Sequence, residues 1–75
     1  MIVYDRNLTN GELTDQGTIR IVDGKLEFKI TSKETEWIIK NSCMYTPDID
    51  PKVFISRLSW LSMSSTIDIH KEEGE

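Results

Sequence analysis

The segment TIRIVDGKLEFKI, residues 18–30, constrains the fold more than any other part of the chain. Asp23-Gly24 is a preferred pair for a two-residue type I′ turn, whose twist matches that of antiparallel strands. Pairing outward from this turn places Arg20 opposite Glu27, as an opposite-charge pair on one face. The apolar side chains of the two strands share the other face: Ile19, Ile21, Leu26 and Phe28. The segment therefore predicts a β-hairpin with one apolar side.

Two shorter segments complete the predicted sheet. Residues 2–4 form a short apolar strand, and residues 66–70 alternate apolar and polar side chains as a final strand does. Between the first strand and the hairpin, Asn10-Gly11 suits a second turn that would place Leu8 opposite Leu13. The polar composition suits a plain loop equally well. We expect an irregular hairpin or a long loop here.

Residues 31–45 predict a helix. Thr31 and Glu34 have the spacing of a capping box. Glu36 and Lys40 have the spacing and direction of an i,i+4 ion pair. On a helical wheel the apolar residues form one group: Trp37, Ile38, Met44 and Tyr45. Residues 35–40 are also acceptable as a strand, but the caps and charges favour the helix.

The stretch YTPDIDPKVF, residues 45–54, contains two closely spaced carboxylates that invite a metal-site interpretation. Asp50 followed by Pro51 is instead typical of a helix start, with a capping side chain and a proline at the first helical position. Asp48 lies in the connecting turn. A calcium loop would need further oxygen donors at alternate positions, and these do not follow. The stretch predicts a second helix with an apolar stripe of Phe54, Leu58 and Leu61, flanked by Ile55.

Together these elements predict an α+β fold: a small antiparallel sheet of three to four strands, with two helices packed on one face. We expect one domain over residues 1–75, with a charged, frayed tail at 71–75. The predicted core comprises Val3, Ile19, Ile21, Leu26, Phe28, Ile38, Phe54, Leu58 and Leu61.

Composition excludes several classes of function. Cys43 and His70 are the only cysteine and histidine, so we expect no internal disulfide and no zinc cage. We also expect no other metal and no cofactor. The net charge of −4 argues against direct nucleic-acid binding. No apolar run is long enough to span a membrane, and no signal peptide precedes the first strand. We therefore expect a location in the cytoplasm or in the interior of whatever particle the protein joins.

Catalysis is not expected either. The chain has no Gly-rich phosphate loop and no nucleophile elbow. Asp68 and His70 are neighbours on one face of a strand, which is an ordinary place for polar side chains. Cys43 has no base evident in the sequence, and such a cysteine is typically a small core residue.

Two surfaces are candidate protein-binding sites. On the second helix, Val53 and Trp60 lie on one side, Met63 extends the group, and Arg57 lies between it and the core stripe. The sequence leaves open whether Trp60 belongs to the core or to an interface. The second surface is acidic and comprises Asp68, Glu72, Glu73 and Glu75.

The order of parts is a strand ending in YDR, a turn with NGEL, a hairpin at VDGKLEF, a tryptophan-bearing helix, YTPDIDPKVF and a final strand. This layout resembles small uncharacterised accessory proteins of phages, archaeal viruses and mobile elements. The resemblance implies an accessory role in a virus or mobile element, either in the particle or against a host system. The residues themselves predict non-catalytic protein binding through the Val53–Trp60 helix face or the outer sheet surface, with another protein or a second copy of the chain as partner. Two alternatives stay open: an acidic inhibitor of a host nucleic-acid-binding defence enzyme, and a small virion structural subunit.

Overall fold

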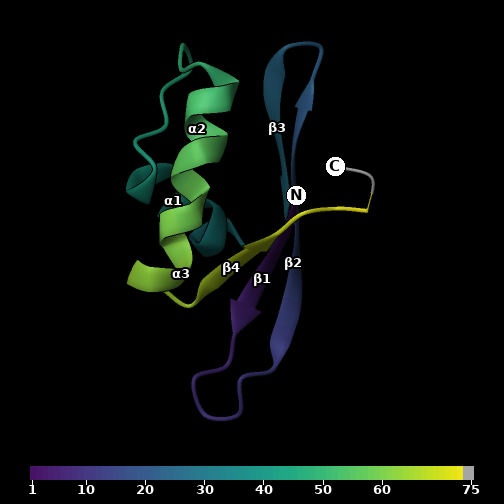
Figure 1. Ribbon diagram of the computed structural model, residues 1–75, viewed down its shortest axis with the longest axis vertical. Helices are drawn as coiled ribbons and strands as arrows, with labels where there is room; N and C mark the ends of the chain where they lie inside the picture. The colour runs from purple at the N-terminus through teal and green to yellow at the C-terminus, as the bar shows by residue number, and fades with distance from the viewer. Residues whose placement is uncertain (74–75) are drawn as a thin grey trace.

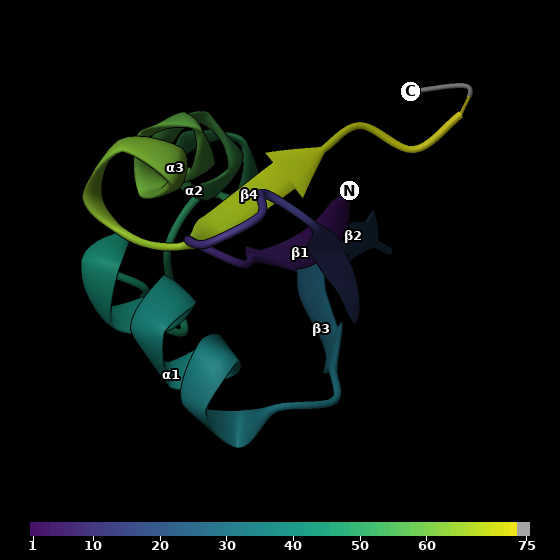
Figure 2. The ribbon, with the colours of Figure 1, turned by 90° about the horizontal axis from the view of Figure 1, so that it is seen from below.

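The computed structural model describes residues 1–73 and shows one four-stranded antiparallel sheet with helices on one face (Figure 1). The strands lie in the order β3-β2-β1-β4. In Figure 2, α1 and the α2–α3 segment lie on the same side of this sheet. The predicted α+β fold is therefore confirmed. The elements are β1 (Ile2–Arg6), β2 (Leu13–Val22), β3 (Lys25–Ile30), α1 (Lys33–Ser42), α2 (Pro51–Arg57), a 3₁₀ turn η1 (Leu58–Trp60), α3 (Leu61–Ser64) and β4 (Ile67–His70).

The β2–β3 hairpin has the predicted register. Ile19 lies opposite Phe28 and Arg20 opposite Glu27. Asp23 and Gly24 have φ values of 51° and 75°, as a type I′ turn requires at both central positions. The charges are used differently from the expectation, because Arg20 forms an ion pair with Glu72, and Glu27 forms one with Lys29 at 3.6 Å.

The connection between β1 and β2 is a loop closed by one asparagine. The backbone N–H of Asn7 donates to the carbonyl of Glu12 at 2.9 Å. The Asn7 side-chain oxygen accepts from the N–H groups of Thr9 and Asn10, at 2.8 and 3.3 Å. Leu13 pairs with Arg6 rather than with Leu8, so the alternative of a tight Asn10-Gly11 hairpin is not formed, and the connection is the expected irregular loop.

A bulge lies in β2 where it pairs with β1. Val3 lies opposite Gly17, whereas Tyr4 lies opposite Asp15, so Gln16 is the extra residue. Gly17 has a φ of 127°, and its N–H donates to the Asp15 side chain at 2.8 Å. The carbonyl of Gln16 is turned toward the end of β3, where it accepts from the N–H of Thr31 at 2.9 Å.

Helix α1 begins one residue later than the sequence suggested. The side chain of Ser32, not Thr31, caps it by accepting from the N–H of Thr35 at 3.2 Å. Thr31, the residue after β3, is tied to the bulge in β2, since both its N–H and its hydroxyl donate to the carbonyl of Gln16. The predicted Glu36–Lys40 ion pair is present at 3.9 Å.

Helix α2 begins as predicted. The Asp50 carboxylate accepts from the N–H of Lys52 at 2.9 Å, and Pro51 occupies the first helical turn. The preceding turn is closed by a bond from the N–H of Ile49 to the carbonyl of Thr46 at 3.1 Å, so Asp48 lies in the connection. The capping interpretation of this acidic stretch is confirmed.

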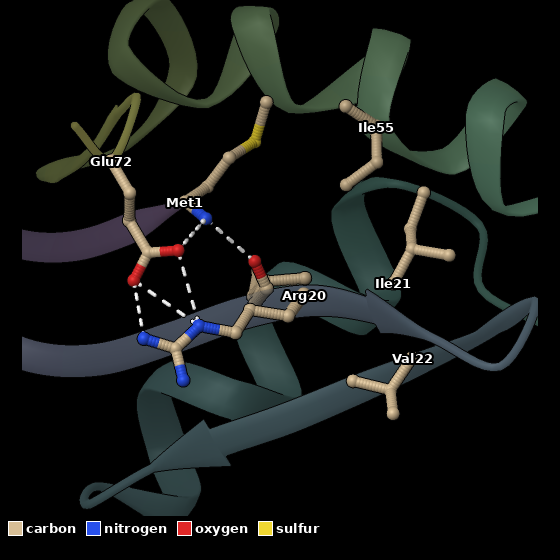
Figure 3. A pocket seen from close by; sticks show the side chains of 7 residues that line it. Met1, Arg20, Ile21, Val22, Ile55 and Glu72 are labelled. Atoms are coloured by element: carbon tan, nitrogen blue, oxygen red, sulfur yellow. Dashed lines mark hydrogen bonds and ion pairs between the residues drawn. The ribbon is translucent and has the colours of Figure 1, made fainter. Parts of the chain in front are cut away.

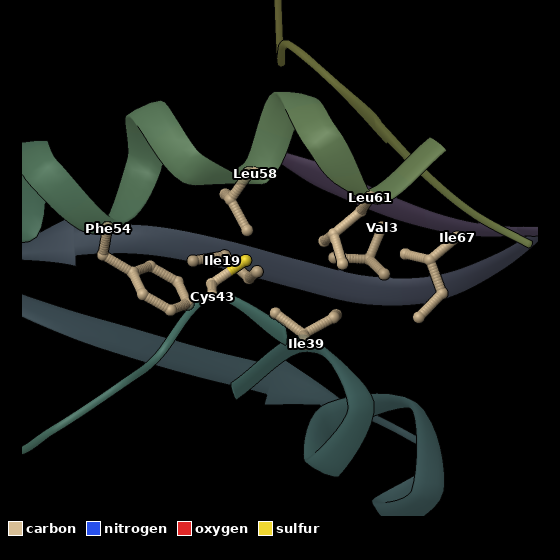
Figure 4. Packing of buried hydrophobic residues seen from close by; sticks show 8 residues of the cluster. All are labelled: Val3, Ile19, Ile39, Cys43, Phe54, Leu58, Leu61 and Ile67. Atoms are coloured by element: carbon tan, nitrogen blue, oxygen red, sulfur yellow. The ribbon is translucent and has the colours of Figure 1, made fainter. Parts of the chain in front are cut away.

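The core lies between the sheet and the helices (Figure 4). Its fully buried residues are Val3, Ile19, Ile39, Cys43, Phe54, Leu58, Leu61 and Ile67. Five of the nine residues predicted to be core are in this set, and Leu26, Phe28 and Ile38 pack partly buried against it. Ile21 is a wrong prediction, because its side chain is 47% exposed.

Helix α1 is rotated relative to the expected apolar face. Ile39 and Cys43, four residues apart, are its buried positions, and Ile38 is only partly buried. Trp37 is 65% exposed, and Met44 is exposed beyond the helix end with a φ of 52°. The way α1 docks on the sheet therefore buries the side that carries Ile39 and leaves the side of Trp37 exposed.

Candidate protein-binding surface

The side of the α2–η1–α3 segment that the core leaves uncovered carries a row of apolar side chains. Val53, Trp60 and Met63 are 41%, 64% and 86% exposed, and we call these three residues the helix-face row. The opposite side of the same segment buries Phe54, Leu58 and Leu61 (Figure 4). Trp60 is therefore not a core residue.

The 3₁₀ turn η1 lies in the middle of this segment. The N–H of Leu61 donates to the carbonyl of Leu58, three residues earlier. Residues three apart are nearly eclipsed in such a turn. This places Leu58 with Leu61 on the core side, and Trp60 with Met63 on the exposed side.

Exposed serines fill the spaces between the large side chains of the row. Their hydroxyls are bonded within the helix: Ser56 donates to the carbonyl of Val53 at 2.7 Å, and Ser59 to that of Ser56 at 3.1 Å. Ser64 donates to the carbonyl of Trp60 at 3.2 Å. Because these donors are already satisfied, covering them with a partner carries little desolvation cost. The row is therefore set in small, uncharged surroundings.

Arg57 is directed toward the protein itself. Its guanidinium donates to the carbonyl of Cys43 at 3.2 Å, which ties α2 to the end of α1. Burial raises the pKa of the Cys43 thiol, and the Arg57 charge acts in the opposite direction with a smaller effect. Cys43 is thus a protonated core residue, and Arg57 holds the helices together beside the helix-face row.

The acidic candidates are held in ion pairs inside the chain. Asp68 on β4 pairs with Arg6 on β1. The same guanidinium donates to the carbonyls of Ser62 and Ser65, both at 3.3 Å. Arg6 therefore joins the sheet to the end of α3, and Asp68 fixes its position.

Glu72 is held where the chain passes β2 after the last strand (Figure 3). Arg20 donates to its carboxylate through Nε at 3.1 and 3.2 Å and through Nη2 at 2.5 Å. The α-amino group of Met1 lies 3.4 Å from the same carboxylate. The hydrogen bond from Arg20 is the main reason that the pKa of Glu72 falls to about 2. Glu72 is therefore anchored, whereas the sequence predicts a frayed tail at 71–75. Glu73 is exposed, and Glu75 lies outside the described residues.

A groove that the sequence did not reveal lies beside Glu72 (Figure 3). The α-amino group of Met1 donates to the carbonyl of Ile19 at 2.8 Å, and the N–H of Ile19 donates to the carbonyl of Met1 at 2.9 Å. Beyond Ile19, β2 has no partner residue in β1. The rest of β2 borders a space of about 360 Å³. Its apolar lining comes mainly from Met1, Ile19, Ile21, Val22 and Ile55. The sequence signal for this groove was the short first strand next to a longer hairpin, which leaves part of the hairpin without a neighbouring strand.

The polar residues considered for catalysis are engaged in other contacts. Asp68 is bonded to Arg6, while His70 packs edge-on against the ring of Tyr4, with centroids 4.9 Å apart. Within residues 1–73, no group of three or more His, Cys, Asp or Glu side chains is placed to hold a metal ion. In the same part of the chain, no helix has the length and apolar character needed to cross a membrane.

The candidate residues thus form two groups: the helix-face row with Arg57 beside it, and the acidic residues around the end of the sheet, of which Asp68 borders the same space as Ser59 and Ser62. Comparisons of the chain with protein-family models, with curated proteins and with solved structures found no match.

Proposed function

We propose that this chain is a non-catalytic protein-binding module, an accessory protein of viral or mobile-element type that works in the host cytoplasm or within a virion. The helix-face row of Val53, Trp60 and Met63 is the binding surface. The observation that carries this proposal is the exposure of three large apolar side chains together on one helix side. A clustered apolar surface of this kind is typical of interaction sites.

The chemistry of the row supports this function. Tryptophan is the residue type most enriched among interface hot spots, and the centres of interfaces are depleted in charge. Charged residues make up 29% of this chain, yet residues 53–64 include only one, Arg57. The long solvent-facing side of a helix ordinarily carries Lys and Glu. Their replacement by serine, tryptophan and methionine favours a surface that becomes covered.

The alternative of an acidic inhibitor is less well supported. Mimicry of nucleic acid needs carboxylates that face a basic partner. Asp68 and Glu72 are instead committed to Arg6 and Arg20. Binding by an acidic surface would weaken steeply as salt rises, whereas binding through the helix-face row would not. The outer sheet surface is the other candidate for protein binding, and it carries the same ion pairs of Asp68 with Arg6 and Glu72 with Arg20.

The test is site-specific photocross-linking in the host cell. A photoreactive aromatic amino acid replaces Trp60 in one version of the chain. In the matched control it replaces Leu8, which is exposed on the β1–β2 loop, away from the helices. We expect discrete covalent adducts from position 60 and none of the same mass from position 8. A further Met63→Asp change should remove the adducts from position 60.

Equal adducts from both positions, or none from position 60 at concentrations where the chain is expressed, would contradict a binding role for this surface. Raising the salt concentration to about 0.5 M before irradiation separates the two partner types, since the Debye length falls well below 10 Å at this ionic strength. Adducts that persist support the apolar surface.

A further inference from the structure

The helix-face row is complementary to itself, and we propose that its partner is a second copy of this chain, packed in antiparallel fashion about a two-fold axis. This inference rests on the proposed function, because it names what covers the same surface. It also supplies the repeated identical contact that a virion structural subunit would use.

The complementarity follows from the order of large and small residues. When two such segments pack antiparallel with the axis at the level of Leu58, Trp60 of one copy lies opposite Ser56 of the other. The two-fold axis repeats this contact, so each indole ring covers a small residue. Val53 of one copy then lies opposite Met63 of the other at both ends. Ridges of large side chains fitted into grooves beside small ones are the usual basis of helix packing.

Charge does not oppose a like partner at this surface. The chain carries a net charge of −4, so two copies repel each other at long range. Residues 53–64 contain neither Asp nor Glu. Their one cation, Arg57, is engaged with the carbonyl of Cys43. Two copies can therefore bring these segments together without placing carboxylates against one another.

The size of the row sets the strength of the contact. A fully buried aromatic side chain contributes about 150–250 Å². One tryptophan, one methionine and one valine per copy thus supply less than the roughly 800 Å² per partner of a standard stable interface. We expect a weak, concentration-dependent dimer with a dissociation constant above about 1 µM.

Sedimentation of the purified full chain from about 10 µM to about 1 mM tests the association, a range chosen around the expected affinity. Trp60→Ala should raise the dissociation constant at least tenfold. Ser56→Gln adds bulk without charge where the opposite indole would lie, and should weaken the dimer similarly. Trp37→Ala is the matched control, since Trp37 is as exposed as Trp60 but lies on α1. Its dimer should be unchanged.

Cysteine cross-linking tests the antiparallel arrangement. A mixture of Val53→Cys and Met63→Cys chains should form a disulfide-linked heterodimer under mild oxidation. Either variant alone should not, since positions 53 and 63 lie about 15 Å apart along a helix. The native Cys43 is buried and gives the background in both cases.

A chain that remains monomeric at about 1 mM, far above the expected dissociation constant, overturns the inference. Equal weakening by Trp37→Ala, or Val53→Cys chains that cross-link as readily alone as in the mixture, overturns it as well. If the chain is monomeric while position 60 still gives adducts with a different protein in the photocross-linking experiment, the proposed function stands and only the second copy fails. If the chain is monomeric and position 60 gives no adducts, both the dimer and the proposed function are refuted.

Discussion

Replacing Gly17 by alanine should destabilise the protein far more than the same change at Gly11. Both glycines have a positive φ, 127° at Gly17 and 75° at Gly11. They differ in their surroundings. A Cβ at position 17 would lie 1.9 Å from the carbonyl oxygen of Lys29 and 2.9 Å from the Cα of Ile30. A Cβ at position 11 would have no atom within 4 Å.

The magnitude follows from what must move. The atoms near position 17 belong to the backbone of β3, so β2 and β3 have to separate at the bulge. A strained backbone conformation costs about 1–3 kcal/mol. Leaving a buried backbone group without its partner costs about 1–3 kcal/mol more. We therefore expect Gly17→Ala to lose about 2–6 kcal/mol, and Gly11→Ala about 1–2 kcal/mol from its φ alone.

Such a loss is large for this chain. At 0.05–0.15 kcal/mol per residue, a protein of this length has a free energy of unfolding of roughly 4–11 kcal/mol. Urea unfolding followed by far-UV circular dichroism measures both variants, with the slope m as the check that the transition remains two-state. If the unfolding free energies of the two variants differ by less than about 0.5 kcal/mol, the close approach of Gly17 to β3 does not limit the side chain at this position.

Three further predictions concern the charge, cap and core residues. Glu72 has a folded-state pKa of about 2, below its usual 4.5, so its stabilising effect is present above pH 4.5 and lost as the pH falls toward 2. The difference in urea midpoint between the wild type and Glu72→Gln should therefore be constant near neutral pH and shrink as the pH falls from 4.5 to 2. A difference as large at pH 2 as at neutral pH would disprove the ion-pair origin. Asp50→Ala should lose about 0.5–2 kcal/mol with the cap of α2, whereas Asp48→Ala in the adjoining turn should change the unfolding free energy by less than about 0.5 kcal/mol. Ile39→Ala should lower the free energy of unfolding by about 2–5 kcal/mol, because it leaves a cavity. Trp37→Ala, at an exposed position, should change it by less than about 0.5 kcal/mol. Thermal unfolding that ranks the two variants in the opposite order would contradict the observed rotation of α1.

The parts of the fold that depend on neighbours in the chain were predictable. The hairpin register follows from Asp23-Gly24, because a two-residue turn and a period of two leave one pairing that gathers the apolar side chains on one face. The start of α2 follows from Asp50 and Pro51, whose roles involve only the next few amides. The i,i+4 pair of Glu36 and Lys40 is equally local.

The candidate site was only half predictable. The sequence grouped Val53, Trp60 and Met63 on one helix side, since this follows from the helical repeat. It did not decide whether that side faces the core. It also treated Asp68 and Glu72 as a solvated acidic surface, whereas their partners Arg6 and Arg20 lie 62 and 52 residues away along the chain.

The sequence by itself determined the turns, the helix starts and the periodicity of each element, because these depend on interactions spanning only a few residues. Tertiary structure alone decided which apolar residues are buried. Ile21 and Ile39 differ little as sequence signals, yet β1 ends before it can cover Ile21, and the docking of α1 buries Ile39. Trp60 is exposed because the opposite side of its segment, with Phe54, Leu58 and Leu61, is the one that packs on the sheet. Which side packs is set by the free energy of the whole core.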